Sequence, residues 1–123
     1  MSTGTRTRYG EIAPYTTKDG SEIRELLHPA QHPGGRNQSL AEAIVAPGET
    51  TRLHRHTETE ELYHITAGEG VMTLGTEHCV VVAGDTVLIP PGTAHAIANT
   101  GHVPLRILCC CAPPYRHEDT ELL

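Results

Sequence analysis

The sequence has no tryptophan and no phenylalanine, and only four tyrosines. A folded core must therefore be built mainly from aliphatic side chains, and the aromatic platforms on which single-stranded nucleic acids stack are scarce. Nine Lys and Arg residues against fifteen Asp and Glu give a formal net charge of -6, and the basic residues form no cluster. We therefore expect no nucleic-acid partner.

Long apolar runs are also missing. No stretch approaches the roughly 18 apolar residues that span a bilayer, and residues 1–15 lack the apolar core of a signal peptide. We therefore expect no membrane partner, and the predicted location is the cytoplasm.

The cysteines form no Cys-x-x-Cys pair. Cys109, Cys110 and Cys111 are consecutive, and neighbours on a strand point to opposite faces, so they are poorly placed to form a disulfide with one another. We interpret these residues and Cys79 as small buried side chains of a reducing compartment. The sequence leaves open whether any of the four lines a functional site.

The length of 123 residues favours one domain, and twelve Gly and nine Pro indicate many turns between short strands. We divide the chain into a terminal segment, residues 1–17, partly mobile and with an edge strand near residues 9–12, and a domain with a C-terminal tail, residues 18–123. Residues 21–28 suit a strand, with a helix as competitor. Residues 29–37 have the composition of a loop, in which Arg36 is a candidate for binding an anionic substrate.

Further strands are predicted at residues 39–46, 51–56, 61–66, 71–74, 79–83, 87–89 and 105–112. Alternation along the third of these places Glu61 and Tyr63 on the inner face and His64 on the outer face. The unbroken apolar run at residues 79–83 predicts a strand covered on both faces. The tail is expected to form a short helical turn with Leu122 and Leu123 packed back.

Two stretches carry the residues for a metal site. His54 and His56 are two positions apart, so a strand presents both imidazoles on one face. Glu61 follows shortly after, and His95 comes just after a Pro-Pro-Gly turn. Imidazoles with a carboxylate from neighbouring strands form a five- or six-coordinate site that keeps open positions.

The same stretches resemble the two motifs of the cupin superfamily. The positions of the first motif are filled by Gly48, His54, His56, Glu61 and Gly68, and those of the second by Gly84, Pro90, Gly92, His95 and Asn99. Glu60 fits a shorter spacing variant of the first motif, but the distance to Gly68 selects Glu61. The resemblance implies an all-β, single-domain cupin jelly-roll β-barrel and a homodimer.

We predict that His54, His56, Glu61 and His95 bind one divalent metal ion, which the sequence narrows only to Fe, Mn, Ni, Zn or Cu. A bound ion would keep a charge of about +1, which favours anionic or chelating oxygen ligands. The alternatives are a barrel that has lost its metal and a purely structural ion. Structural zinc sites are usually closed and rich in cysteine.

The resemblance implies a metal-dependent enzyme, dioxygenase-like, that acts on a small polar oxygen-bearing metabolite. The alternatives are a redox-neutral isomerase, epimerase or lyase, or a non-enzymatic small-molecule binding module. Acid–base chemistry would need a catalytic base, for which Tyr63 is the candidate, although it also suits plain core packing. We expect a small pocket with aliphatic walls and Tyr63 as its one aromatic residue, suited to a small acid, keto-acid or sugar-like molecule.

Overall fold

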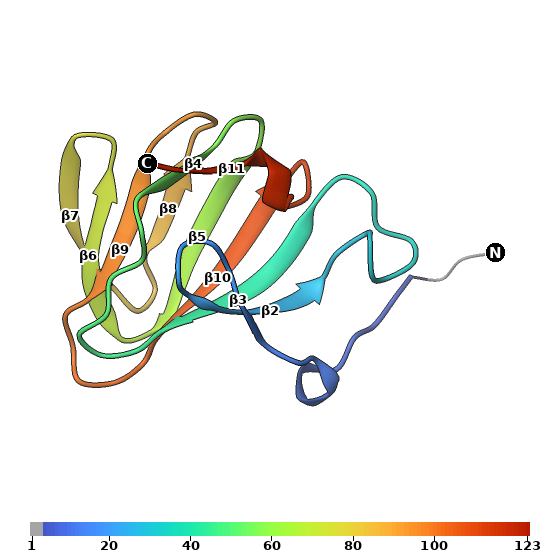
Figure 1. Ribbon diagram of the computed structural model, residues 1–123. Helices are drawn as coiled ribbons and strands as arrows, with labels where there is room; N and C mark the ends of the chain where they lie inside the picture. The colour runs from blue at the N-terminus through green and yellow to red at the C-terminus, as the bar shows by residue number, and fades with distance from the viewer. Residues whose placement is uncertain (1–3) are drawn as a thin grey trace.

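The computed structural model describes residues 4–123, and it consists of two antiparallel β-sheets that face each other in a jelly roll (Figure 1). Residues 1–3 of the predicted terminal segment lie outside this range. The first sheet has the strand order β1 (Tyr15–Thr16), β2 (Glu22–Leu27), β3 (Ser39–Val45), β10 (Leu105–Ala112), β5 (Glu60–Ala67), β8 (Thr86–Ile89). The second has the order β11 (Thr120–Leu122), β4 (His54–His56), β9 (His95–Asn99), β6 (Glu69–Leu74), β7 (Glu77–Val82). The all-β jelly roll predicted from the motifs is therefore confirmed.

The core lies between the sheets and is aliphatic, as the lack of Phe and Trp requires. Inward-facing residues alternate with outward-facing ones along the long strands β5 and β10. The most deeply buried core side chains, each no more than 1% exposed, are Ile65, Met72, Ile89, Ile97, Leu105 and Ile107. This packing occupies one part of the space between the sheets, and buried polar residues line another part.

Two uncertain segments near the N-terminus are settled by the structure. Residues Glu22–Leu27 form strand β2, as favoured over the helix, and β2 pairs with β3. The prediction of an edge strand near residues 9–12 is wrong, because Tyr9–Glu11 form the 3-10 helix η1. The hydroxyl of Tyr9 donates a hydrogen bond to Glu42. At Tyr9–Glu11 the backbone turns and pairs with no other strand of residues 4–123.

The prediction that residues 79–83 are covered on both faces is wrong for this chain. They fall mostly in β7, which pairs with β6 along one side and forms the edge of its sheet (Figure 1). Val81 faces the core, whereas Val80 is 72% exposed and Cys79 is exposed as well. An unbroken apolar run does not distinguish a strand between two layers from an edge strand, because both faces carry the same residue types.

The C-terminal tail closes the second sheet. The expected helical turn is present as η2 (His117–Asp119), but β11 follows it and pairs with β4, which the sequence did not indicate. Buried Asp119 accepts backbone hydrogen bonds from Glu58 and Thr59, so the tail is anchored to the loop after β4. Leu123 stays exposed rather than packed back.

The outer face of the first sheet carries a row of apolar side chains. Cys110 on β10 pairs with Leu40 on one side and Leu62 on the other, and Leu62 pairs in turn with Leu88. All three leucines are more than one-third exposed. Within residues 4–123, no helix has the length and hydropathy needed to cross a membrane.

Candidate metal centre

Three histidines from two neighbouring strands of the second sheet converge inside the jelly roll. His54 and His56 alternate with the more exposed Arg55 on β4, so both imidazoles point inward. His95, at the start of β9, is the cross-strand partner of His54. One ring nitrogen of each histidine lies within 4.8 Å of the other two, which is a spacing that a single metal ion can bridge.

The other ring nitrogen of each histidine is held by the protein. Nδ1 of His54 lies 2.8 Å from the carbonyl oxygen of Arg52, and Nδ1 of His95 lies 3.0 Å from that of Thr93. Nδ1 of His56 lies 3.0 Å from Oγ1 of Thr120, on the tail strand. Such contacts fix ring orientation and leave Nε2 as the ligand atom, as in metal-binding histidines generally. Burial lowers the pKa of His54, which favours the neutral form that binds metal.

Glu61 reaches the triad from β5, on the opposite sheet. Its Oε1 lies 3.2 Å from Nε2 of His56 and 3.5 Å from Nε2 of His95. Burial raises the pKa of Glu61, but the two imidazoles outweigh burial and bring it to about 2, so the group is a carboxylate. Neither contact to Oε1 has the geometry of a hydrogen bond, and each is an ion pair only when the histidine is protonated.

Two atoms of this cluster lack a hydrogen-bond partner among the described residues, namely Oε1 of Glu61 and Nε2 of His95. Both are fully buried, and leaving such atoms unpaired is costly. A cation between them would bind the carboxylate oxygen and the lone pair of a neutral imidazole together. The residues therefore fit a metal ion, and the assignment of all four as ligands stays a prediction.

The far oxygen of Glu61 is held by Cys111, whose Sγ lies 3.3 Å from Oε2 and donates to it. Burial raises the pKa of the Cys111 thiol, so it stays a protonated donor rather than a thiolate ligand. The sequence left open whether any of the four cysteines lines the site, and the structure answers this in part. Cys109 and Cys111 line the cavity, whereas Cys110 faces outward and Cys79 is exposed, and all four are free.

We expect Cys111→Ala to weaken metal binding by about tenfold, because the carboxylate loses the donor that orients it. Cys111→Ser keeps a donor and should restore most of the affinity. Cys110→Ala, on the other face of the same strand, is the matched control and should bind as wild type. Titration of metal into the purified variants measures the effect, and equal affinities for Cys111→Ala and Cys110→Ala would contradict the role.

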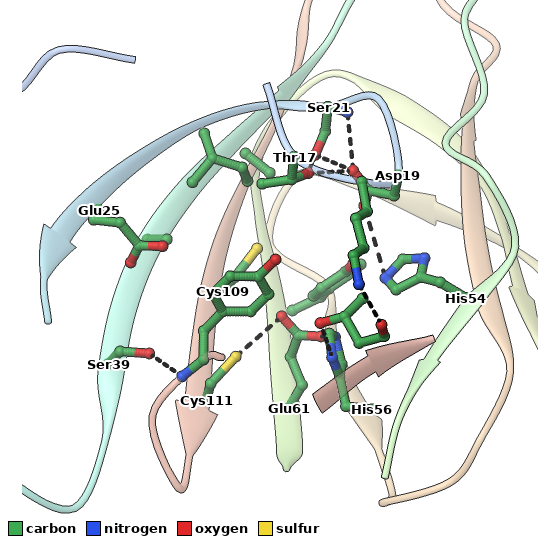
Figure 2. Close-up of a pocket in the computed structure, with 17 residues that line it drawn as sticks. Thr17, Asp19, Ser21, Glu25, Ser39, His54, His56, Glu61, Cys109 and Cys111 are labelled. Carbon is green, nitrogen blue, oxygen red and sulfur yellow. Dashed lines mark hydrogen bonds and ion pairs between the residues drawn. The ribbon is translucent and has the colours of Figure 1, made fainter. Parts of the chain in front are cut away.

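A second carboxylate approaches the triad from the N-terminal hairpin. Asp19, in the turn before β2, has Oδ1 held by the hydroxyl of Thr17 at 2.6 Å and by the backbone and hydroxyl of Ser21 at 2.9 and 2.7 Å. Its Oδ2 lies 3.7 Å from Nε2 of His54, as Figure 2 shows. The sequence analysis did not identify Asp19 as a residue of the site.

A third contribution comes from the C-terminal tail. The ring of Tyr115 stands edge-on to that of His56, with 5.9 Å between the ring centres. Its backbone N–H donates to Oγ of Ser39 at 2.9 Å, which fixes the tail against β3. Nothing in the sequence pattern of the tail marks Tyr115 or Thr120 as site residues, because their placement depends on the unpredicted pairing of β11 with β4.

Tyr63 points inward beside the triad, as alternation along β5 predicted. It is 5% exposed, and its ring centre lies 5.9 Å from that of His95. Burial and the charge of Glu61 raise the pKa of Tyr63 well above its usual value. The hydroxyl therefore stays protonated near neutral pH and suits donation of a proton better than removal of one. His64, the next residue, faces outward and contacts Thr86, as expected.

These groups surround one cavity, which encloses about 500 Å³ of space free of protein atoms, part of it open to solvent. The prediction of aliphatic walls is wrong, because carboxylates, hydroxyls and a second aromatic ring, Tyr115, share the lining with Ile23, Ala41 and Ala43. Arg36, the candidate for binding an anionic substrate, is exposed and does not line the cavity. Asn99 lies away from it and donates to the carbonyl oxygens of Val45 and Val103.

Comparison with known proteins agrees with this fold. The family model described as a cupin domain matches residues 41–111. An uncharacterized protein of Methanocaldococcus jannaschii is 58% identical over 118 residues, which cover 96% of this chain and 94% of the relative. An oxalate-binding protein of Thermotoga maritima is 31% identical over 111 residues, which cover 86% of this chain and 92% of that protein.

Among solved structures, a predicted oxalate decarboxylase of Thermotoga maritima superimposes with a TM-score of 0.77 at 27% identity. The match covers 89% of this chain and 99% of the other. The similarity therefore spans nearly the whole of that protein and includes both sheets.

Proposed function

This chain belongs to the cupin domain family, and from that premise we propose that it is a mononuclear metal-dependent enzyme acting on a small oxygen-bearing metabolite. One observation carries the proposal. Among residues 4–123, the buried atoms Oε1 of Glu61 and Nε2 of His95 lack a hydrogen-bond partner, although they lie 3.5 Å apart, next to the other two imidazoles and beside a cavity open to solvent. A closed structural site would leave no such access.

The ion would be held by His54, His56, His95 and Glu61 and would be Fe, Mn, Ni, Zn or Cu. Such an ion, when bound, polarises an oxygen of the substrate and stabilises negative charge that develops there. The protein orients the ligands through Arg52, Thr93 and Thr120, and through the thiol of Cys111. The N-terminal hairpin and the C-terminal tail add Asp19, Tyr115 and Thr120 to the lining of the cavity.

The acid–base groups of the cavity support redox-neutral chemistry, an isomerisation, epimerisation or elimination. Burial raises the pKa of Tyr63, so its hydroxyl stays protonated at neutral pH and can donate to a substrate oxygen that becomes strongly basic during the reaction. Asp19 offers Oδ2 as a proton acceptor near the triad, since its other oxygen takes all three hydrogen bonds. An acid and a base around one polarised oxygen are the groups that an enolisation or elimination requires.

Dioxygenation is the second candidate, and the donor set favours it. Three imidazoles and one carboxylate would leave open positions on a six-coordinate ion, which is the donor set that oxygen-dependent chemistry would require. The two candidates differ in a simple requirement, because only dioxygenation consumes O₂.

Turnover measured with and without O₂ separates the candidates. We expect metal-loaded protein to convert a small hydroxy- or oxo-compound without O₂, and Tyr63→Phe to lower the rate by about 100-fold, since it removes the proton donor. Tyr9→Phe, at an exposed tyrosine, is the matched control. Oxygen uptake with an unchanged rate in Tyr63→Phe would favour dioxygenation. Ligand-dependent thermal stabilisation without turnover would indicate a binding module.

We further propose a homodimer that covers the apolar row Leu40, Leu62 and Leu88. Contiguous exposed apolar side chains on a sheet face are typical of interaction surfaces. Leu62→Glu places a charge at the centre of the row and is expected to convert the dimer into a monomer in light scattering. Val103→Glu changes an exposed loop residue of similar character and should leave the mass unchanged. An unaltered dimer in Leu62→Glu would exclude this face.

A further inference from the structure

One buried carboxylate of the cavity has no place in the metal site. Glu25 on β2 is 4% exposed and lines the cavity wall on the side of the first sheet. Figure 2 shows its side chain directed inward from a strand opposite His54 and His56. The hydroxyl of Tyr15 donates to Oε1 at 2.7 Å, whereas Oε2 is buried without a hydrogen-bond partner in the described part of the chain.

An unpaired buried carboxylate oxygen is costly for a residue with a purely structural role. Its desolvation is not offset by a donor, and burial of unpaired charge is disfavoured more strongly still. Tyr15 satisfies only one of the two oxygens. A ligand that enters the cavity with a hydrogen-bond donor would satisfy the other, so Oε2 points to a ligand contact.

The charge around the cavity narrows the class of that ligand. Three buried carboxylates, Asp19, Glu25 and Glu61, line one space. Lys18 is the only Lys or Arg among the lining residues. Its Nζ donates to the carbonyl oxygens of His117 and Thr120 at 3.1 and 2.9 Å, so it is engaged in holding the tail.

The three carboxylates offset the two positive charges of a divalent ion and the one of Lys18, so the cavity carries no net positive charge. The sequence alone suggested a net positive site that favours anions, because it supplied only Glu61. With Asp19 and Glu25 in the same cavity, a second ligand carboxylate at the far end would meet like charge in a partly desolvated space, where repulsion is strong. A hydroxyl or ammonium group there would instead pair with Oε2.

We propose that the cavity selects a small ligand with an oxygen end for the metal and a hydrogen-bond-donor end, hydroxyl or ammonium, for Glu25, and that it discriminates against dicarboxylates. The inference rests on the proposed function and gives its substrate class. In this proposal, Glu25 determines which chemical group is accepted at the end of the ligand that lies away from the metal. By this criterion the chain differs in ligand preference from its relative that is named an oxalate-binding protein.

Calorimetry on the Mn(II)-loaded protein with matched probes tests the proposal. Succinate, 4-hydroxybutanoate and 4-aminobutanoate share a carboxylate end and differ at the far end, and malonate, 3-hydroxypropanoate and β-alanine repeat the series at a shorter length. We expect the hydroxyl or ammonium member of at least one series to bind about tenfold or more tightly than the dicarboxylate. Bound Mn(II) is measured separately.

Two variants identify the group responsible. Glu25→Gln is close in size and removes the charge, so it should weaken the ammonium probe by about tenfold, weaken the hydroxyl probe less, and strengthen the dicarboxylate. A larger effect on the ammonium probe than on the hydroxyl probe therefore separates the two donor types. Tyr15→Phe removes the neighbouring donor but keeps the carboxylate, and it should preserve the wild-type order.

Three results would overturn the inference on protein that holds Mn(II): the dicarboxylate binds most tightly, no probe binds, or Glu25→Gln and Tyr15→Phe change every probe equally. Failure of the protein to hold Mn(II) or any other divalent ion would instead contradict the proposed function. The probe series on metal-free protein would then still report the preference of Glu25, through the difference between the ammonium probe and the dicarboxylate.

Discussion

Replacement of His95 by glutamine is expected to abolish metal binding while the jelly roll stays folded. His95 is fully buried, its Nδ1 is taken by the carbonyl of Thr93, and its Nε2 has no hydrogen-bond partner in the described chain. Glutamine fills similar space but supplies an amide in place of an imidazole. Loss of groups that merely orient a ligand costs 10- to 100-fold in affinity, so loss of the ligand should cost more than about 100-fold.

The measurement is elemental analysis of untagged protein, together with thermal unfolding before and after metal addition. Wild type is expected to hold close to one ion per chain and to gain stability from it, because a ligand that binds only the folded state stabilises that state. His64→Gln, on the outer face of β5, is the matched histidine control. Equal metal content in His95→Gln and His64→Gln would remove the basis for the proposed centre.

Gly70→Ala is expected to destabilise the protein by about 3 kcal/mol. Gly70 on β6 is buried and lies beside β9, the strand that carries His95. A Cβ at this position would stand far inside the van der Waals distance of the carbonyl oxygen of Ala98 and close to a methyl of Leu105. The clash is with backbone, so the two paired strands must move apart to accommodate the methyl group.

Denaturant unfolding measures this loss, and Gly10→Ala is the control because a methyl group there meets nothing within 4 Å. A shift of β9 would also displace His95, so the fraction of Gly70→Ala that remains folded should bind metal more weakly than wild type. An unfolding midpoint equal to that of Gly10→Ala would show that the paired strands tolerate the side chain.

The strands and the histidine triad were predictable from the sequence because their signals are local. His54 and His56 share a face through the two-residue period of a strand, and the same period placed Tyr63 inward and His64 outward. The motif spacing brought in Glu61 and His95 from other strands. Most strand positions, including β7, followed from Gly and Pro turns, whereas the helix η1 and the exposure of β7 did not. A local sequence pattern does not show which other segments lie beside a strand.

The other half of the cavity was not predictable, because it is made by the two ends of the chain. Asp19 and Glu25 come from the N-terminal hairpin, and Tyr115 and Thr120 come from the tail after β10. No fixed spacing connects these residues to the motifs. They meet the triad only because β2 pairs with β3 and β11 pairs with β4.

The sequence by itself determined the all-β architecture, the family resemblance and the cluster of imidazoles with one carboxylate. Each of these depends on residue types and on short spacings along the chain, which are present in the sequence before the chain folds. Only the tertiary structure decided the charge of the cavity, which the sequence alone suggested to be net positive, and with it the ligand class that we propose. Charge in a cavity is a sum over side chains brought together from distant segments, and that sum exists only once the sheets have closed around it.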